Sequence, residues 1–87
     1  MNVKQEFYIV AVKDELTGTF LQPTFGENLD ALKRIFATQI NTIAIWKENA
    51  SDFSLYSLGK FDQETGYITP ECMKLVSGHS VLRKENA

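Results

Sequence analysis

One turn motif occurs twice in this chain, as Asp-Glu-Leu-Thr-Gly at residues 14–18 and as Asp-Gln-Glu-Thr-Gly at residues 62–66. The Asp that opens such a turn accepts hydrogen bonds from the backbone amides just ahead of it. The Gly that closes it supplies the positive φ required by a type I turn with a following bulge. Strand-like residues flank both motifs, so the sequence predicts two β-hairpins.

The strands of these hairpins are predicted from the flanking residues. Residues 6–13 and 53–61 are rich in β-branched and aromatic residues, which favour strands. Residues 19–22 and 67–69 predict shorter second strands, each ending before a proline, which has no amide proton to offer a sheet. Residues 71–82 are expected to form a last short strand or a turn.

Between the hairpins, apolar residues recur at helical spacing. They are Leu29, Leu32, Ile35, Phe36, Ile40 and Ile43. Asn28 is a good N-cap and Asp30 complements the helix dipole, so we expect a helix that begins near Asn28 and frays around residues 41–42. Thr24 with Glu27 offers an alternative capping box. Residues 43–51 are expected to be a last helical turn or a loop. The predicted fold class is α+β: a small antiparallel sheet of two hairpins with one helix between them (ββαββ), the helix packed on one sheet face.

Length and composition predict a single domain in a reducing compartment. The chain has 87 residues, of which we assign 6–82 to the domain and 83–87 to a frayed C-terminal tail. A net charge of −2 excludes an arginine-rich DNA-packaging peptide but leaves room for a local basic patch. The single cysteine, Cys72, cannot form an intramolecular disulfide, and no apolar run is long enough to span a bilayer. We therefore expect a cytoplasmic protein.

No residue pattern indicates catalysis or metal binding. His79 is the only histidine, and with Cys72 it does not supply the three or four ligands of a zinc site. The paired acids at 14–15 and 62–64 lie in the turns, and turn formation explains them without catalysis. No phosphate-binding loop or nucleophile motif is present. The sequence thus predicts a non-enzymatic protein without a cofactor, a metal or a small-molecule substrate.

One helix cannot cover both faces of a four-stranded sheet, so apolar residues on the second face need an explanation. Strict alternation along the two long strands predicts that this face contains Tyr8, Val10, Val12, Tyr56, Leu58 and Lys60. One covering is a homodimer, with an interface formed by Tyr8, Val10, Val12, Tyr56 and Leu58.

Two other interpretations of this face stay open. Single-stranded nucleic acid would stack on Tyr8 and Tyr56, with Tyr67 as a candidate third ring, beside Lys60 and Lys13. Alternatively, Trp46 and the C-terminal segment cover the face within the same chain. Further candidate phosphate contacts lie on the polar side of the helix and just beyond it, although solubility also explains them; these residues are Lys33, Arg34 and Lys47.

The run Asp-Phe-Ser-Leu-Tyr-Ser-Leu-Gly-Lys-Phe-Asp at residues 52–62, with the Thr-Gly turn after it, resembles the hallmark segment of a known family. The family is the small nonstructural protein of gokushovirus-type microviruses, which are single-stranded DNA bacteriophages. Pro23-Thr-Phe25 and Asn28 also match, so the resemblance covers residues 6–70. Ala50-Ser51 departs from it, because the family often has Pro-Glu there.

The resemblance implies a non-enzymatic phage protein of the host cytoplasm that acts in single-stranded DNA genome synthesis or packaging. It would bind DNA or the phage replication and packaging proteins. The alternative is a dimeric protein–protein adaptor or host-factor modulator with no nucleic-acid contact. The acidic net charge favours this alternative, and the phage setting favours the first interpretation.

Overall fold

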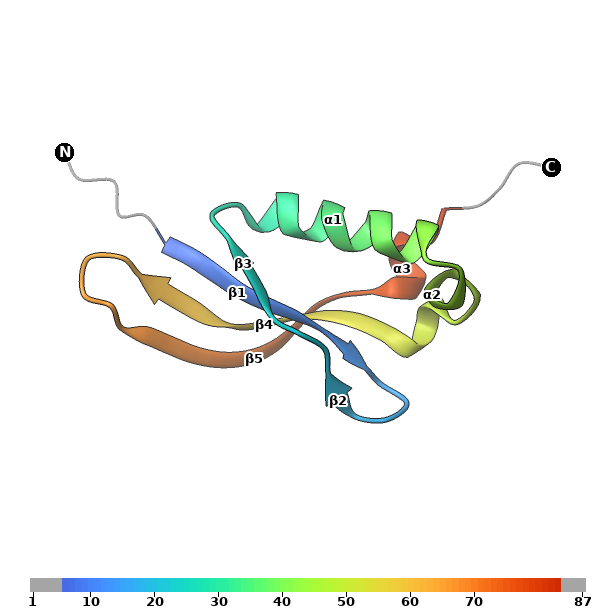
Figure 1. Ribbon diagram of the computed structural model, residues 1–87, viewed down its shortest axis with the longest axis horizontal. Helices are drawn as coiled ribbons and strands as arrows, with labels where there is room; N and C mark the ends of the chain where they lie inside the picture. The colour runs from blue at the N-terminus through green and yellow to red at the C-terminus, as the bar shows by residue number, and fades with distance from the viewer. Residues whose placement is uncertain (1–5, 84–87) are drawn as a thin grey trace.

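The structure is a computed structural model that describes residues 6–83, and it contains one antiparallel sheet with helices on one side (Figure 1). The strands are β1 (Glu6–Asp14), β2 (Thr19–Phe20), β3 (Thr24–Gly26), β4 (Phe53–Asp62) and β5 (Ile68–Ser77). The helical elements are α1 (Leu29–Thr42), α2 (Ala44–Glu48), the 3-10 turn η1 (Ala50–Asp52) and α3 (Gly78–Val81). The predicted small α+β fold, with a helix packed on an antiparallel sheet, is confirmed.

The two long strands β1 and β4 pair with each other in the middle of the sheet. β2 and β3 both pair with β1 on one side, and β5 pairs with β4 on the other. The β1–β2 and β4–β5 hairpins therefore meet along β1 and β4, with β2 and β3 at one edge of the sheet and β5 at the other.

Both predicted turns are present with the expected geometry. Asp14 Oδ1 accepts a hydrogen bond from the Leu16 amide at 3.0 Å, and Asp62 Oδ1 accepts one from the Glu64 amide at 2.9 Å. Each turn is closed by a 2.8 Å bond from the glycine amide to the carbonyl of the opening aspartate. Gly18 has a φ of 79° and Gly66 a φ of 78°, which is the left-handed conformation that the motif requires.

The helix begins and ends where the sequence indicates. The Asn28 side chain caps α1 by accepting a 3.1 Å hydrogen bond from the Ala31 amide, and the helix ends at Thr42. The core between α1 and the sheet is formed by Leu32, Phe36, Ile40, Val10, Val12 and Leu55, with Ala50 from η1. Ile35 and Ile43, which the helical spacing also assigned to the core, are exposed instead.

The connection after α1 is helical and carries Trp46. The Trp46 ring stacks on Phe53 with 4.9 Å between ring centroids, and both side chains pack against the core. Residues 43–51, expected as a helical turn or a loop, thus form α2 and η1, which cover the end of the sheet beside α1 (Figure 1).

The strand boundaries differ from prediction at both prolines. The expected strand 67–69 does not end before Pro70, because β5 continues to Ser77. β5 is an edge strand, where a residue without an amide proton is tolerated. The expected strand 19–22 ends at Phe20: Leu21 still donates its amide to the Val12 carbonyl at 2.8 Å, and residues 22–23 interrupt the pairing before β3 resumes it with β1.

The predicted outer face is wrong, because alternation breaks in β4. Ile9 pairs with Gly59 and Val10 with Ser57, so Leu58 is an extra residue that reverses the alternation of the strand. Val10 and Val12 lie beneath α1, where they are 1% and 8% exposed. Tyr56 lies on the opposite face of the sheet, so the six residues predicted for one face are divided between two.

The C-terminal segment of the described chain is attached to α1. Asn41 donates a side-chain hydrogen bond to the Val81 carbonyl at 3.0 Å and accepts one from the Arg83 amide at 2.7 Å. Residues 84–87 of the predicted tail lie outside the described residues.

Candidate functional site

The sheet face turned away from α1, which we call the helix-free face, carries two groups of side chains. The first, the aromatic–lysine cluster, lies where β1 and β2 meet their turn and consists of Lys13, Glu15, Phe20, Tyr56 and Lys74. The second, the apolar end, lies toward the β4–β5 turn and consists of Phe7, Ile9, Phe25, Phe61 and Ile68.

Strand pairing brings the rings and the lysine of the cluster together. Lys13 lies opposite Phe20 in the β1–β2 ladder, and Tyr56 lies opposite Ala11 one strand further. The Phe20 and Tyr56 rings meet edge to face with 5.4 Å between centroids. Lys13 Nζ lies 5.5 Å from the Phe20 centroid and 5.3 Å from that of Tyr56, within the range of a cation–π interaction.

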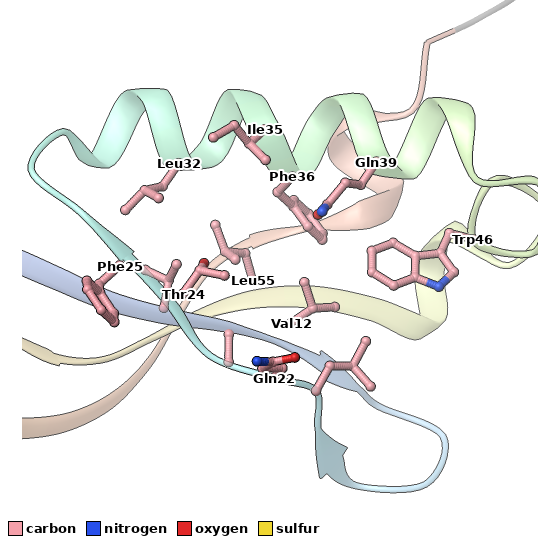
Figure 2. A pocket seen from close by; sticks show the side chains of 13 residues that line it. Val12, Gln22, Thr24, Phe25, Leu32, Ile35, Phe36, Gln39, Trp46 and Leu55 are labelled. Carbon is pink, nitrogen blue, oxygen red and sulfur yellow. The ribbon is translucent and has the colours of Figure 1, made fainter.

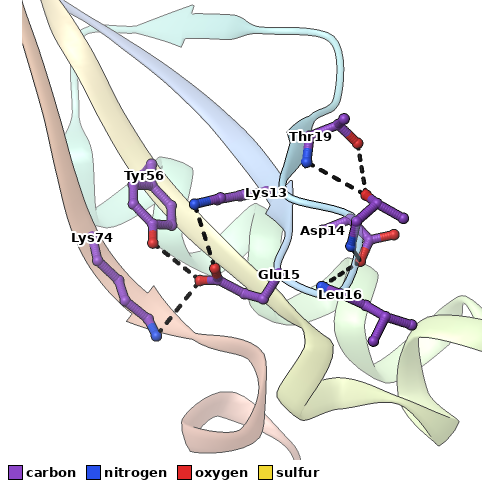
Figure 3. A network of polar contacts seen from close by, with 8 residues as sticks. Lys13, Asp14, Glu15, Leu16, Thr19, Tyr56 and Lys74 are labelled. Carbon is purple, nitrogen blue, oxygen red and sulfur yellow. Dashed lines mark hydrogen bonds and ion pairs between the residues drawn. The ribbon is translucent and has the colours of Figure 1, made fainter.

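Glu15 connects the cluster through its carboxylate (Figure 3). Tyr56 donates its hydroxyl to Glu15 Oε2 at 3.0 Å, and the ammonium groups of Lys13 and Lys74 lie 3.6 and 3.7 Å from the two carboxylate oxygens. Two lysines and one glutamate leave the cluster with a net positive charge. Phe20 is 39% exposed, so an aromatic surface and a positive charge are presented together.

The electrostatics of this network shift two pKa values. Burial raises the pKa of the Glu15 carboxyl, but the neighbouring hydroxyls of Tyr56 and Ser54 and the charges of Lys13 and Lys74 together bring it below its ordinary value of 4.5. Burial and the hydrogen bond to Glu15 raise the pKa of the Tyr56 phenol above its ordinary value of 10.0. At neutral pH the carboxylate is therefore charged and the phenol is protonated.

The other predicted nucleic-acid contacts lie elsewhere. Tyr8 and Lys60 form a pair on the α1 side of the sheet, with Lys60 Nζ 5.8 Å from the Tyr8 ring centroid. Lys33 and Arg34 are on α1 and Lys47 is on α2. The structure does not bring them together with Tyr56 into one platform.

The sequence pattern did not point to Phe20, Glu15 or Lys74 as site residues. The position of the first turn could have indicated Phe20. A turn at residues 14–18 pairs Asp14 with Thr19, and therefore Lys13 with Phe20. Lys74 had no such signal, since its place beside Glu15 depends on the irregular pairing of β4 with β5.

The predicted dimer interface also needs correction. Val10 and Val12 are buried in the core of a single chain, so they are not available to a second copy. Tyr8 packs against the same core, and Leu58 is the half-buried extra residue of β4. Of the five predicted residues, Tyr56 is the one that lies on the helix-free face.

The apolar end is a hollow of about 270 Å³ between the two edges of the sheet. Phe7 and Phe61 lie opposite each other on β1 and β4, with their rings stacked at 6.4 Å. Phe25 at one edge is 71% exposed and Ile68 near the other is 58% exposed. An apolar hollow with exposed apolar margins is typical of a surface that contacts another molecule.

A second groove, of about 300 Å³, lies between α1 and the interruption of β2 and β3 (Figure 2). Leu32 and Phe36 form its α1 side, and Trp46 lies at one end. Gln22 and Gln39 also line the groove, which contains no charged side chain.

The described residues show no metal site and no membrane-spanning helix. Within residues 6–83, no group of three or more His, Cys, Asp or Glu side chains is placed to hold a metal ion. Cys72 is exposed on β5. No helix in the described part of the chain is long and apolar enough to cross a membrane.

The fold and these surfaces define a small α+β domain whose uncovered sheet face is suited to contact another molecule. A family model described as "Phage ORF5 protein" matches residues 7–81, which is most of the chain. The chain belongs to the Phage ORF5 protein family, so the prediction of a bacteriophage protein is confirmed. No curated protein and no solved structure matched the chain.

Proposed function

We propose that this chain is a non-enzymatic phage protein of the gokushovirus-type group that acts in the host cytoplasm. Its role is in single-stranded DNA genome synthesis or packaging, and it binds DNA through the aromatic–lysine cluster of the helix-free face. The observation that carries this proposal is the position of Lys13 near the rings of both Phe20 and Tyr56, on the sheet face that no helix of residues 6–83 covers.

Physical chemistry supports single-stranded DNA as the ligand of this cluster. Sheet-borne aromatic rings stack on unpaired bases irrespective of sequence, and adjacent lysines contact the phosphates. Phe20 is the exposed ring, and the Lys74 side chain is 50% exposed and can turn from Glu15 to a phosphate. A duplex hides its bases, so this surface favours single strands.

A matched set of variants at Phe20 tests the stacking role. Fluorescence anisotropy of a labelled oligothymidine is measured at about 50 mM salt, where phosphate contacts are strong. Phe20→Tyr keeps an aromatic face and should bind like the original protein. Phe20→Leu keeps apolar bulk but no ring, and it should weaken binding roughly 5- to 150-fold.

Salt dependence tests the phosphate contact separately. Lys74→Ala should reduce the slope of log affinity against log salt by about 0.7, the contribution of one phosphate contact to a single strand. Arg34→Ala, on the far side of α1, is the control and should leave the slope unchanged. Failure of the unmodified protein to bind, or loss of binding in Arg34→Ala alone, would contradict the proposal.

The second candidate function is a dimeric adaptor or host-factor modulator without nucleic-acid contact. The apolar end favours this function, because it has no cation and the chain has a net charge of −2. Absence of oligonucleotide binding, together with stable self-association, would select it over the first.

A further inference from the structure

We infer that the helix-free face binds the same face of a second copy of this chain, with the apolar end at the centre of the interface. The five residues of the apolar end supply the contact surface in place of the valines that strict alternation predicted. The inference does not need DNA binding, and its test is made first in the absence of DNA.

The shape of the apolar end suits a copy of itself. β3 and β5 lie at opposite edges of the sheet, and the hollow lies between them over β1 and β4. Figure 2 shows Phe25 and Leu32 on opposite sides of β3, so Phe25 points away from the core. When two sheets pack face to face about a two-fold axis along the strands, β3 of each copy lies over β5 of the other. Phe25 of one copy then meets Ile68 of the other at both margins.

Charge on the face is compatible with this pairing. None of the five residues of the apolar end is charged, so burying them removes no charged group from water. In the neighbouring cluster, Glu15 contacts both Lys13 and Lys74, so each copy brings a single net positive charge to the margin of the interface. These charged side chains would form the polar rim that surrounds the apolar centre of most interfaces.

The area of the helix-free face is sufficient for a specific dimer interface only when the whole face is buried. The strands have 9, 2, 3, 10 and 10 residues, and at a rise of about 3.3 Å per residue and a spacing of about 4.8 Å between strands they give a face on the order of 540 Å². Two copies would bury about 1,100 Å² together, just below the usual range for stable interfaces and above the ~1,000 Å² that a specific interface needs. We therefore expect a reversible dimer whose population depends on concentration.

The edges of the sheet are poor alternatives to the face. Each edge carries one of the two prolines of the chain, Pro70 within β5 and Pro23 between β2 and β3. Proline and local irregularity at an edge hinder strand addition. Self-association by pairing of edge strands is thus disfavoured. Two copies can instead associate through the apolar end of the helix-free face.

Sedimentation equilibrium of the full chain over a range of concentrations tests the dimer. Ile68→Asp and Phe25→Asp each place a carboxylate in the interface, and both should shift the protein to monomer at concentrations where the original dimerises. Ile45 on α2 is 63% exposed, close to the 58% of Ile68, so Ile45→Asp is a matched control that should dimerise normally. Circular dichroism checks that each variant is folded.

Each result decides the inference. A strictly monomeric original protein, or a dimer that Ile45→Asp abolishes as well as Ile68→Asp does, would overturn it. Because a dimer using the whole face covers Phe20, added oligothymidine should shift the original protein toward monomer if it binds the cluster. In the other outcome, the dimer is unaffected by oligothymidine and the anisotropy assay shows no binding. That result would support the dimer and contradict only the DNA-binding proposal.

Discussion

Gly18 and Gly66 occupy equivalent places at the ends of the two turns, with nearly equal φ. No atom lies within 4 Å of a Cβ added at either position, so any penalty for substitution comes from the backbone alone. Gly66→Val should destabilise the protein by roughly 1–3 kcal/mol, and Gly18→Val should behave alike. Gly66→Asn is the control and should cost less, because Asn tolerates the left-handed conformation. Thermal melting checks this, and an unchanged melting temperature in both valine variants would contradict it.

The Glu15 carboxylate links stability to acid pH. Its folded-state pKa is below 4.5, so the unfolded chain binds this proton more tightly than the folded chain does. The stabilisation is present above that ordinary value and is lost as pH falls through the folded pKa. Glu15→Gln should therefore lower the melting temperature at pH 7 and flatten its decline toward pH 3. The exposed Glu48→Gln is the control; an identical acid profile in Glu15→Gln and the original protein would refute the assignment.

At the scale of elements, the irregularity of β4 decides which side chains share a face. Leu58 is the extra residue, and next to it Gly59 lies against β5: a Cβ there would be 2.6 Å from the Thr69 carbonyl oxygen. Gly59→Ala should cost about 1–3 kcal/mol, because backbone atoms must move to admit the methyl group and because the φ of 156° at Gly59 is one that residues with a Cβ rarely adopt.

Gly26→Ala is the control for this steric effect. The added Cβ would lie 3.3 Å from Cδ2 of Leu32, a side chain that can adjust, so a smaller loss in the free energy of unfolding is expected from denaturant titration. Equal losses in the two variants would show that close packing at Gly59 is not what holds the β4 irregularity in place.

Local elements were predictable because their signals are local. The Asp-to-Gly spacing defines both turns, and Asn28 with the apolar stripe defines α1. The β4 irregularity was not predictable in the same way, because it is a property of pairing between strands distant in sequence. Gly59 was visible as a possible break in alternation, but a glycine in a strand does not say which neighbour is extra. The predicted site was therefore incomplete. Tyr56 was identified, but its contacts Phe20 and Glu15 were not.

Across the whole molecule, the helices cover only part of the sheet. The β4–β5 hairpin extends beyond α1 in Figure 1, and the molecule measures 52 × 29 × 16 Å. All strand residues of the buried core, Val10, Val12 and Leu55, lie in the part that the helices cover. Within residues 6–83, the far part, with Phe61 and Ile68, is a single layer whose side chains are not buried by a second element.

This asymmetry predicts unequal hydrogen exchange, which measures local opening. Amides of the distal part, residues 59–69, should exchange faster than those around Val12 and Leu55 in dilute protein, where the monomer dominates. Raising the protein concentration should slow exchange in the distal part selectively, because the second copy supplies the missing layer. Ile68→Asp is the control and should show no such dependence on concentration. Distal amides that are as protected as the core in dilute protein would mean that a single chain stabilises its whole sheet, and that the apolar end needs no partner to remain folded.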